Sequence, residues 1–183
     1  MPNEPVADLR IRAAHASDAA ALARLIGELG YETTDAEMMT RLQSILSDGR
    51  YKTVVAVIGG QICGMIGTIS FPSYEHNDLS GRIIALVVSK QMRRTGIGAR
   101  LIAAAERDFE QRKITRIAVN TRLTRQDAHQ FYEKLGYKRT GFRFSKNLSL
   151  TINDQVPRKA PLRQRERRAG RPPGARRNSR GWN

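Results

Sequence analysis

The sequence predicts an α/β protein with a mixed sheet, and three observations carry this prediction. Helical and strand patterns alternate along the chain in the order β-α-α-β-β-β-α-β-α-β. Gly59-Gly60 joins two β-rich runs, which is a strong signal for an antiparallel hairpin. Further along, an apolar strand is followed by a helix and another strand, which indicates a parallel crossover.

The first elements are a strand and two helices. Residues 9–13 have the composition of a short strand. Ser17 is placed to cap a helix whose apolar positions follow helical spacing, and Gly30 ends that helix. Thr34 and Glu37 have the spacing of a capping box, so a second helix is expected to begin there.

The remaining elements are predicted from hydrophobic runs and from the glycines that end them. The two hairpin strands are rich in β-branched residues, and the next strand is almost continuously apolar, which is typical of burial on both faces. Glycine closes the last helix. The expected bounds are strands at 53–58, 61–70 and 83–89, a helix at 98–112, a strand at 114–120, a helix at 126–135 and a final strand at 142–148.

Length and composition predict one folded domain over about residues 8–150 of the 183, preceded by a flexible segment at 1–7. The tail at 151–183 holds nine arginines, four prolines and three glycines, without helical or strand periodicity. Such a segment buries too little apolar surface to offset its ordering entropy, so we expect it to be disordered.

Several classes of protein are excluded or disfavoured. No apolar run approaches the ~18 residues of a membrane span, and the N-terminus has no secretory signal pattern. The single cysteine, Cys63, can form neither an internal disulfide nor a Cys-based zinc site. The three histidines lie far apart in the sequence, which argues against a metal centre. A reducing cytoplasm is the expected location.

The net charge of +15 is spread unevenly. Residues 1–80 carry −4, residues 81–150 carry +11 and residues 151–183 carry +8. This asymmetry predicts a site for an anion in the second half, with something neutral or cationic facing the first. Weak nonspecific nucleic-acid binding by the arginine-rich tail is an alternative reading, although the tail has one aromatic residue, Trp182, and no known binding motif.

The most informative segment is the apolar strand that runs through an Arg-x-x-Gly-x-Gly turn straight into a helix. Backbone N–H groups at the start of that helix would point outward and form an anion site suited to a pyrophosphate. The turn lacks the Gly-Lys-Ser/Thr of a Walker loop and the third glycine of a dinucleotide fingerprint. The residues expected to line the site are Arg93, Arg94, Thr95, Gly96, Ile97, Gly98 and Ala99.

This turn and the segment AHQFYEKLGY, residues 128–137, together resemble the acetyl-CoA motif and the A-x-x-x-Y-E-K-x-G-F/Y segment of GNAT-type N-acetyltransferases. The element order agrees from Leu9 to Leu148. The resemblance implies the GNAT fold, acetyl-CoA as cosubstrate, no metal, and acetyl transfer to a primary amine by direct attack in a ternary complex.

The resemblance also implies roles for particular residues. The backbone of Leu86, Val87 and Val88 would hydrogen-bond the pantetheine arm. Tyr132 would lie beside the thioester sulfur, where a phenol with a pKa of ~10 is protonated at neutral pH and can donate to the departing thiolate. Backbone N–H groups near the same strand could stabilise the developing oxyanion.

Two positions depart from the family pattern. Many members carry a glutamate on the strand before the turn, whereas residues 82–87 hold no carboxylate. Glu75, His76 and Asp78 on the preceding loop are the remaining weak candidates for the base. Arg125 stands where the family often has an asparagine, so one usual contact to coenzyme A is in doubt and a phosphate contact is the alternative.

The acceptor half of the chain is acidic. Glu28, Glu32 and Asp35 cluster around the junction of the first two helices and favour a cationic amine, either a small molecule or a protein amine. A non-catalytic module that senses coenzyme A is an alternative, because the strand carboxylate is missing. An exposed edge strand near 142–150 would permit a homodimer, so both a monomer and a homodimer are left open.

Overall fold

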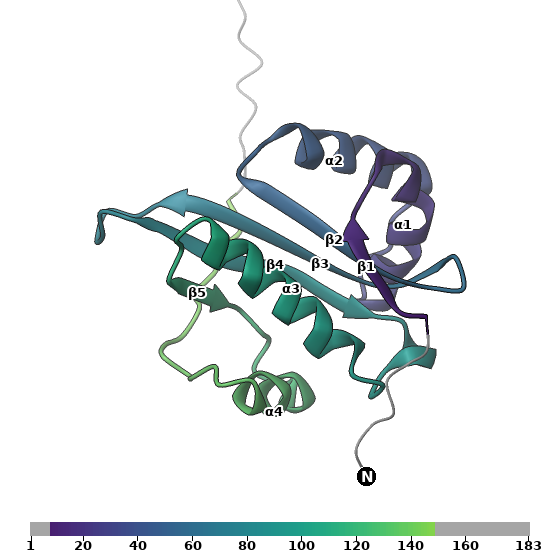
Figure 1. The fold of residues 1–183 in the computed structure, drawn as a ribbon. Coiled ribbons are helices and arrows are strands. Elements are labelled where there is room, and N and C mark those ends of the chain that lie inside the picture. Colours follow the sequence, from purple (N-terminus) through teal and green to yellow (C-terminus); the bar gives the residue numbers. More distant parts are fainter. Residues whose placement is uncertain (1–7, 149–183) are drawn as a thin grey trace, which may run out of the picture. The chain divides into compact units, whose positions relative to one another are not determined.

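The computed structural model describes residues 8–148, and these form a five-stranded sheet with helices on both faces (Figure 1). The strands lie in the order β1-β2-β3-β4-β5. The first four are antiparallel, and β4 and β5 are parallel, as the hairpin and crossover signals predicted. Their bounds are β1 (Arg10–Ala13), β2 (Tyr51–Ile58), β3 (Gln61–Pro72), β4 (Leu79–Val88) and β5 (Arg116–Val119).

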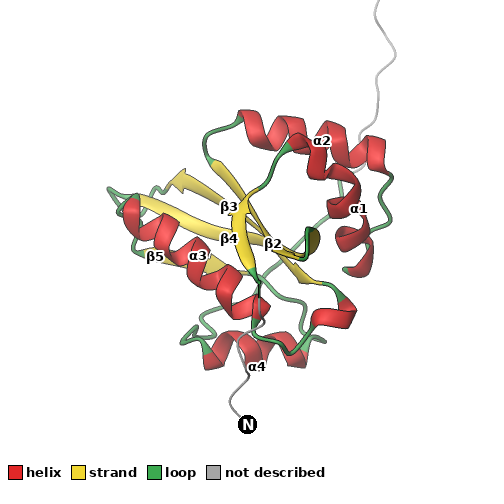
Figure 2. Cartoon of the chain, turned by 45° about the vertical axis from the view of Figure 1, so that its right-hand side comes forward, coloured by secondary structure: helices red, strands yellow, loops and turns green. Residues whose placement is uncertain are grey.

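Helices α1 and α2 cover one face of the sheet and α3 covers the other (Figure 2). The predicted capping box of α2 is confirmed, because the Glu37 N–H donates to Thr34 Oγ1 at 3.2 Å and the Thr34 N–H donates to Glu37 Oε2 at 2.8 Å. The helices are η1 (Ala16–Asp18), α1 (Ala19–Glu28), α2 (Asp35–Ser47), η2 (Lys90–Met92), α3 (Ile97–Gln111) and α4 (Gln126–Lys134).

The start of α1 differs from the prediction that Ser17 caps it. A 3-10 turn, η1, precedes the helix, and the carboxylate of Asp18 accepts the His15 N–H at 2.8 Å. The same carboxylate accepts two hydrogen bonds from the Arg12 guanidinium on β1, at 2.7 and 2.9 Å. Asp18 directly precedes α1, and its carboxylate binds Arg12 and the His15 N–H without capping α1. Local spacing does not reveal the partner on β1.

Two apolar clusters fill the space on either side of the sheet. Adjacent residues such as Val54 and Val55 belong to opposite clusters, as the pleat of a strand requires. This is why the central strands read as continuous apolar runs. Toward α1 and α2 the cluster holds Leu22, Leu25, Met38, Leu42, Val55, Met65 and Val87, and toward α3 it holds Val54, Ile66, Ile83, Leu101, Ile102 and Ala105.

The predicted strand at 142–148 is wrong, because these residues carry no strand. The side chains of Phe142 and Phe144 are 82% and 92% exposed. Apolar alternation is a local pattern, whereas a strand also needs a neighbour that pairs with its backbone. Residues 142–148 therefore offer no edge strand through which a homodimer could pair.

Among residues 8–148 no helix is both long enough and apolar enough to cross a membrane. The same part of the chain contains no cluster of three or more His, Cys, Asp or Glu side chains that could hold a metal ion. The predictions made for residues 1–7 and for the tail at 151–183 lie outside the described residues.

Candidate functional site

Strands β4 and β5 separate partway along β4. β5 pairs with β4 only as far as Ile83, whereas β3 pairs with β4 as far as Val88. Just after the last β5 pair lies a β-bulge, in which Ile84 has no partner residue on β3. A bulge bends its strand and increases the local twist, which accounts for the separation. Beyond it, the edge of β4 that faces β5 is open along residues expected to bind pantetheine: Leu86, Val87 and Val88.

The glycine-rich turn connects the open end of β4 to α3. Gly96 has φ 85° and Arg94 has φ 65°, and the Thr95 hydroxyl fixes the turn by donating to the Met92 carbonyl at 2.6 Å. The backbone bond from Arg100 to the Gly96 carbonyl, 3.1 Å long, closes the first helical turn. The N–H groups before it have no partner within the helix and are oriented to meet an anion. They belong to Ile97, Gly98 and Ala99.

The two motifs that carried the family resemblance meet at Gly98. A Cβ atom at this position would lie 3.3 Å from the Phe131 ring and 3.8 Å from Val88 Cγ2. Gly98 therefore allows α4 to approach the start of α3 and the open end of β4. This contact brings together two segments that a helix and a strand separate in the sequence.

Arg93 folds back onto β4 and α1. Its Nε donates to the Val88 carbonyl at 3.2 Å, and its guanidinium lies 3.6 Å from the Glu28 carboxylate. Glu28 also accepts the Lys90 N–H at 2.7 Å. Glu28 thus ties the end of α1 to the turn after β4 and is engaged there. Glu32, on the loop after α1, and Asp35, in the first turn of α2, are exposed and make no ion pair within residues 8–148.

Tyr132 lies on α4 among aromatic rings. Its ring centroid is 5.2 Å from that of Phe131 and 5.6 Å from that of Tyr137, both edge-on. Burial raises the pKa of Tyr132 to about 12, against the opposing effect of the nearby Arg125 charge. The Tyr137 hydroxyl donates to Glu106 at 2.9 Å, whereas the Tyr132 hydroxyl has no hydrogen-bond partner within the described part of the chain.

The loop before α4 makes contacts in two directions. Arg125 precedes the helix, with its guanidinium 3.9 Å from the Asp127 carboxylate. His129 Nε2 lies 3.1 Å from the Arg122 carbonyl oxygen. The Arg122 guanidinium donates to the Tyr31 hydroxyl at 3.0 Å and lies over its ring at 5.6 Å. The loop between α1 and α2 therefore touches the loop between β5 and α4.

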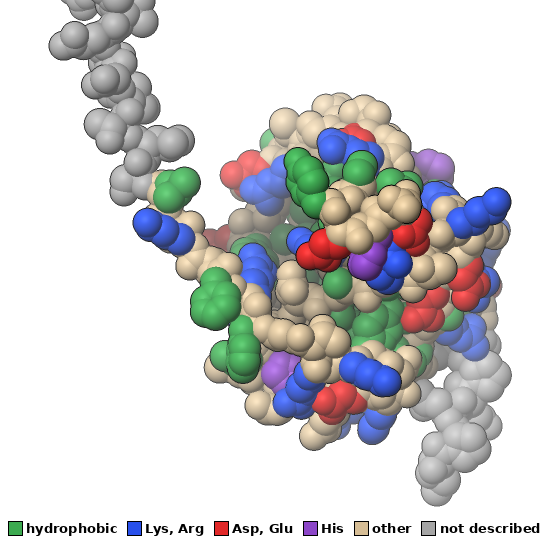
Figure 3. All heavy atoms as spheres, turned by 90° about the vertical axis from the view of Figure 1, so that its left-hand side faces the viewer, with side chains coloured by type: hydrophobic (Ala, Val, Ile, Leu, Met, Phe, Trp, Pro, Cys, Tyr) green, Lys and Arg blue, Asp and Glu red, His purple; other side chains and the backbone are tan. Residues whose placement is uncertain are grey.

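The three candidate bases lie on the β3–β4 loop, away from the turn before α3. Glu75 and His76 are exposed. On the face of the molecule seen in Figure 3, acidic and basic side chains are interspersed. Asp78 is bound by the Arg116 guanidinium, and this hydrogen bond holds the pKa of the carboxyl below its usual range. A carboxylate in an ion pair is a poor proton acceptor, so Asp78 is the weakest of the three candidates.

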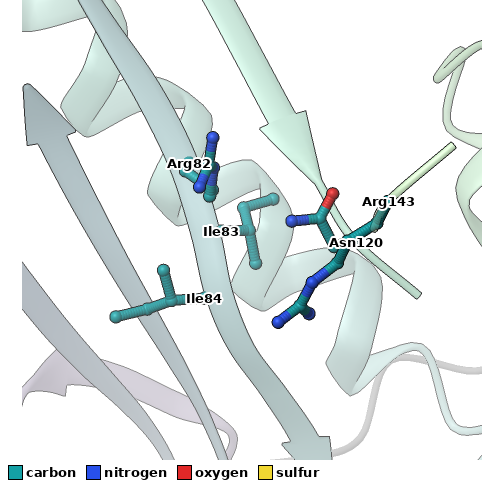
Figure 4. Close-up of a pocket in the computed structure, with 5 residues that line it drawn as sticks. All are labelled: Arg82, Ile83, Ile84, Asn120 and Arg143. Atoms are coloured by element: carbon teal, nitrogen blue, oxygen red, sulfur yellow. The ribbon is translucent and has the colours of Figure 1, made fainter. Parts of the chain in front are cut away.

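A pocket of about 310 Å³ lies where β4 and β5 separate (Figure 4). Arg82 and Ile84 lie on β4, and Asn120 follows the last residue of β5. In Figure 4 the side chains of Asn120 and Arg143 extend into the gap toward β4. Ile83 completes the lining. The sequence analysis did not single out these residues. The one local signal was Arg82, a charged residue at the start of a long apolar run.

Comparisons with known proteins agree with this geometry. Residues 15–153 match the acetyltransferase (GNAT) domain. An aminoalkylphosphonate N-acetyltransferase of Salmonella typhimurium is 37% identical over 94 residues, which cover 51% of this chain. The match spans 61% of the length of that relative.

Solved structures extend the likeness over most of the chain. A GNAT family acetyltransferase of Staphylococcus aureus is 26% identical, with a TM-score of 0.68 over 77% of this chain and 99% of that one. An aminoglycoside acetyltransferase from an uncultured soil metagenomic sample, 21% identical, has the same fold, with a TM-score of 0.70 over 80% of this chain and 100% of that one. The domain match covers well over half of the residues, so this chain belongs to the GNAT acetyltransferase family.

Proposed function

We propose that the protein transfers an acetyl group from acetyl-CoA to a primary amine. The observation that carries this proposal is the open edge of β4 leading directly into the glycine-rich turn before α3. An extended pantetheine arm can add to the free edge of a strand in the way that a further strand would, and a pyrophosphate suits the N–H groups at the start of the helix.

Acetyl-CoA supplies a thioester whose carbonyl carbon accepts the amine. The new C–N bond forms as the C–S bond breaks, and the thiolate leaves and takes up a proton. Leu86, Val87 and Val88 would hold the pantetheine arm through their backbone, and the turn from Arg93 to Ala99 would hold the pyrophosphate. The net charge of +11 over residues 81–150 favours a ligand with several negative charges.

Tyr132 is the proposed hydrogen-bond donor to the departing sulfur. Its pKa of about 12 keeps the phenol protonated at any pH at which the enzyme would work. The same high value makes it a weak acid toward a thiolate, whose conjugate acid has a pKa of ~8.5. Its contribution is therefore a hydrogen bond that strengthens as negative charge develops on the sulfur.

The proton lost by the amine goes to solvent in this proposal. β4 carries no carboxylate, and Glu75 and His76 are exposed on the loop before it. An amine with a solution pKa near ~10 is almost entirely protonated at pH 7. The enzyme would bind the small neutral fraction, and this makes the rate depend on the protonation of the acceptor.

The proposed acceptor is a small amine. The Salmonella relative is described as acting on aminoalkylphosphonates, and these are the first compounds to test. A protein amine remains the alternative acceptor.

The test is a pH–rate profile with a primary amine as acceptor. Thiol release and acetylated amine should appear in equal amounts. We expect kcat/KM to rise about tenfold per pH unit below the pKa of the amine. A profile that is flat over this range would contradict attack by the neutral amine. Saturable binding of acetyl-CoA without thiol release from any amine would favour the non-catalytic sensing module instead.

A further inference from the structure

The pocket between β4 and β5 has the side chains of an anion site. Two of its five lining residues are arginines, Arg82 and Arg143, and a third, Asn120, carries an amide. Among residues 8–148, no carboxylate lines it. In Figure 4 the Asn120 amide nitrogen points from the end of β5 toward β4. Five guanidinium N–H donors per arginine and the amide N–H₂ group give the pocket an excess of donors.

Neither arginine forms an ion pair with an acid in the described part of the chain. Within residues 8–148, seven other arginines lie within 4 Å of a carboxylate, but no ion pair includes Arg82 or Arg143. Asp78, the residue before β4, forms its ion pair with Arg116. The Arg82 guanidinium instead lies over the Phe71 ring at 5.2 Å, which orients it without cancelling its charge.

The pocket is separate from the pyrophosphate turn. It lies at Arg82–Ile84, before the open segment of β4, whereas the turn from Arg93 to Ala99 follows that segment. At about 3.3 Å per residue, Leu86 lies about 7 Å beyond Ile84 along the strand. A small acceptor with its amine at the open segment would therefore place its other end in this pocket.

We propose that Arg82, Asn120 and Arg143 bind the phosphonate or phosphate group of an amine acceptor. The assignment rests on the proposed acetyl transfer. A group with three oxygens and up to two negative charges matches two guanidinium groups and an amide better than a carboxylate, which has two oxygens and one charge. Because the pocket lies close to the open segment of β4, the acceptor that fits should have only a few carbons between its amine and its phosphorus.

The experiment compares three acceptors of similar length in the full chain: 2-aminoethylphosphonate, β-alanine and propylamine. With saturating acetyl-CoA, kcat/KM should be highest for the phosphonate, intermediate for the carboxylate and lowest for propylamine. Arg82→Gln and Arg143→Gln should each reduce the preference for phosphonate over propylamine by about 10- to 100-fold, as loss of a charged hydrogen bond predicts. Arg24→Gln, an exposed arginine on α1, is the matched control and should keep the preference.

The ratio of kcat/KM for the phosphonate to kcat/KM for propylamine distinguishes a loss of phosphonate recognition from a loss of folded protein. Misfolding would lower the rates with all three amines together and leave this ratio unchanged. Equal kcat/KM for the phosphonate and propylamine would overturn the proposal, and so would a phosphonate preference that survives both variants. Equal values for the phosphonate and β-alanine would overturn the choice of a phosphorus oxyanion.

A calorimetric titration of 2-aminoethylphosphonate into the protein with coenzyme A present makes the test independent of turnover. Binding that weakens about tenfold or more in Arg82→Gln would support the pocket assignment even if no amine is acetylated, in which case only the proposed function fails. Absence of binding in the unmodified protein would overturn the assignment.

Discussion

Tyr132 has an environment that keeps its proton in place. The hydroxyl sits on a ring packed between Phe131 and Tyr137, and burial raises its pKa to about 12. If this hydroxyl donates to the leaving sulfur, Tyr132→Phe removes the donor and keeps the ring contacts. We expect kcat to fall by about a hundredfold or more, with little change in the affinity for acetyl-CoA.

Steady-state kinetics and calorimetry on the same preparation check this prediction. Tyr137→Phe is the matched control, because it removes a hydroxyl from the same aromatic group and that hydroxyl bonds to Glu106 instead. A Tyr132→Phe enzyme with undiminished kcat would show that the Tyr132 hydroxyl does not assist the departing sulfur.

The charged carboxylate of Asp18 stabilises the fold, and this contribution is lost at acid pH. The Arg12 hydrogen bonds, aided by the His15 N–H, lower the pKa of the Asp18 carboxyl, and burial opposes this effect. A carboxyl whose pKa is lower in the folded state contributes stability above its unfolded pKa of ~3.9, and this contribution is lost as the pH falls through the folded value.

We therefore expect Asp18→Asn to lower the free energy of unfolding at pH 7 by about 1–3 kcal/mol. The difference from the unmodified protein should shrink as the pH falls below ~3.9, because the unmodified carboxyl then loses its charge as well. Urea unfolding at several pH values measures this, with Glu32→Gln as an exposed control. A difference that stays constant down to low pH would contradict the ion pair as its source.

At the scale of elements, the position of α3 against β4 depends on a close contact at Gly81. A Cβ atom there would lie 2.8 Å from the Phe109 ring, which is fully buried. Gly81→Ala must displace either the ring or the strand. We expect it to lower the free energy of unfolding by about 1–3 kcal/mol.

Gly49→Ala is the matched control for this change, since no atom lies within 4 Å of the Cβ it would add. Its effect should stay within about 0.5 kcal/mol. Equal urea midpoints for the two variants would contradict the packing of α3 described above.

The elements that were predictable are those with short-range signals. The Gly59-Gly60 hairpin, the Thr34–Glu37 capping box and the parallel crossover after β4 are each encoded within a few residues or by element order. The bulge at Ile84 and the absence of a strand at 142–148 depend on which backbones pair. Pairing is a property of the folded sheet, so neither could be read from local patterns.

At the scale of the whole molecule, the acidic first half and the basic second half of the chain meet in the ion pair between Glu28 and Arg93. The acidic first half was expected to draw a cationic amine, with Glu28 among the residues responsible. In the structure Glu28 contacts Arg93 and the Lys90 N–H beside the glycine-rich turn. The predicted turn lies beside Phe131 of α4, whereas the arginine-lined pocket joins residues that are up to 61 positions apart, Arg82 and Arg143. Such a site forms only when the strands separate, and no spacing rule reveals it.

The turn before α3 and the open edge of β4 are the proposed binding site of acetyl-CoA, and a calorimetric titration of acetyl-CoA into the full chain measures this binding. We expect saturable binding that Gly96→Glu abolishes, because this change adds negative charge and a side chain at φ 85°. Gly60→Glu is the matched control, because it adds the same side chain at φ 79° on the β2–β3 hairpin. The Gly60→Glu protein should bind acetyl-CoA as the unmodified protein does. Absence of binding in the unmodified protein, or equal binding by both variants, would contradict the account.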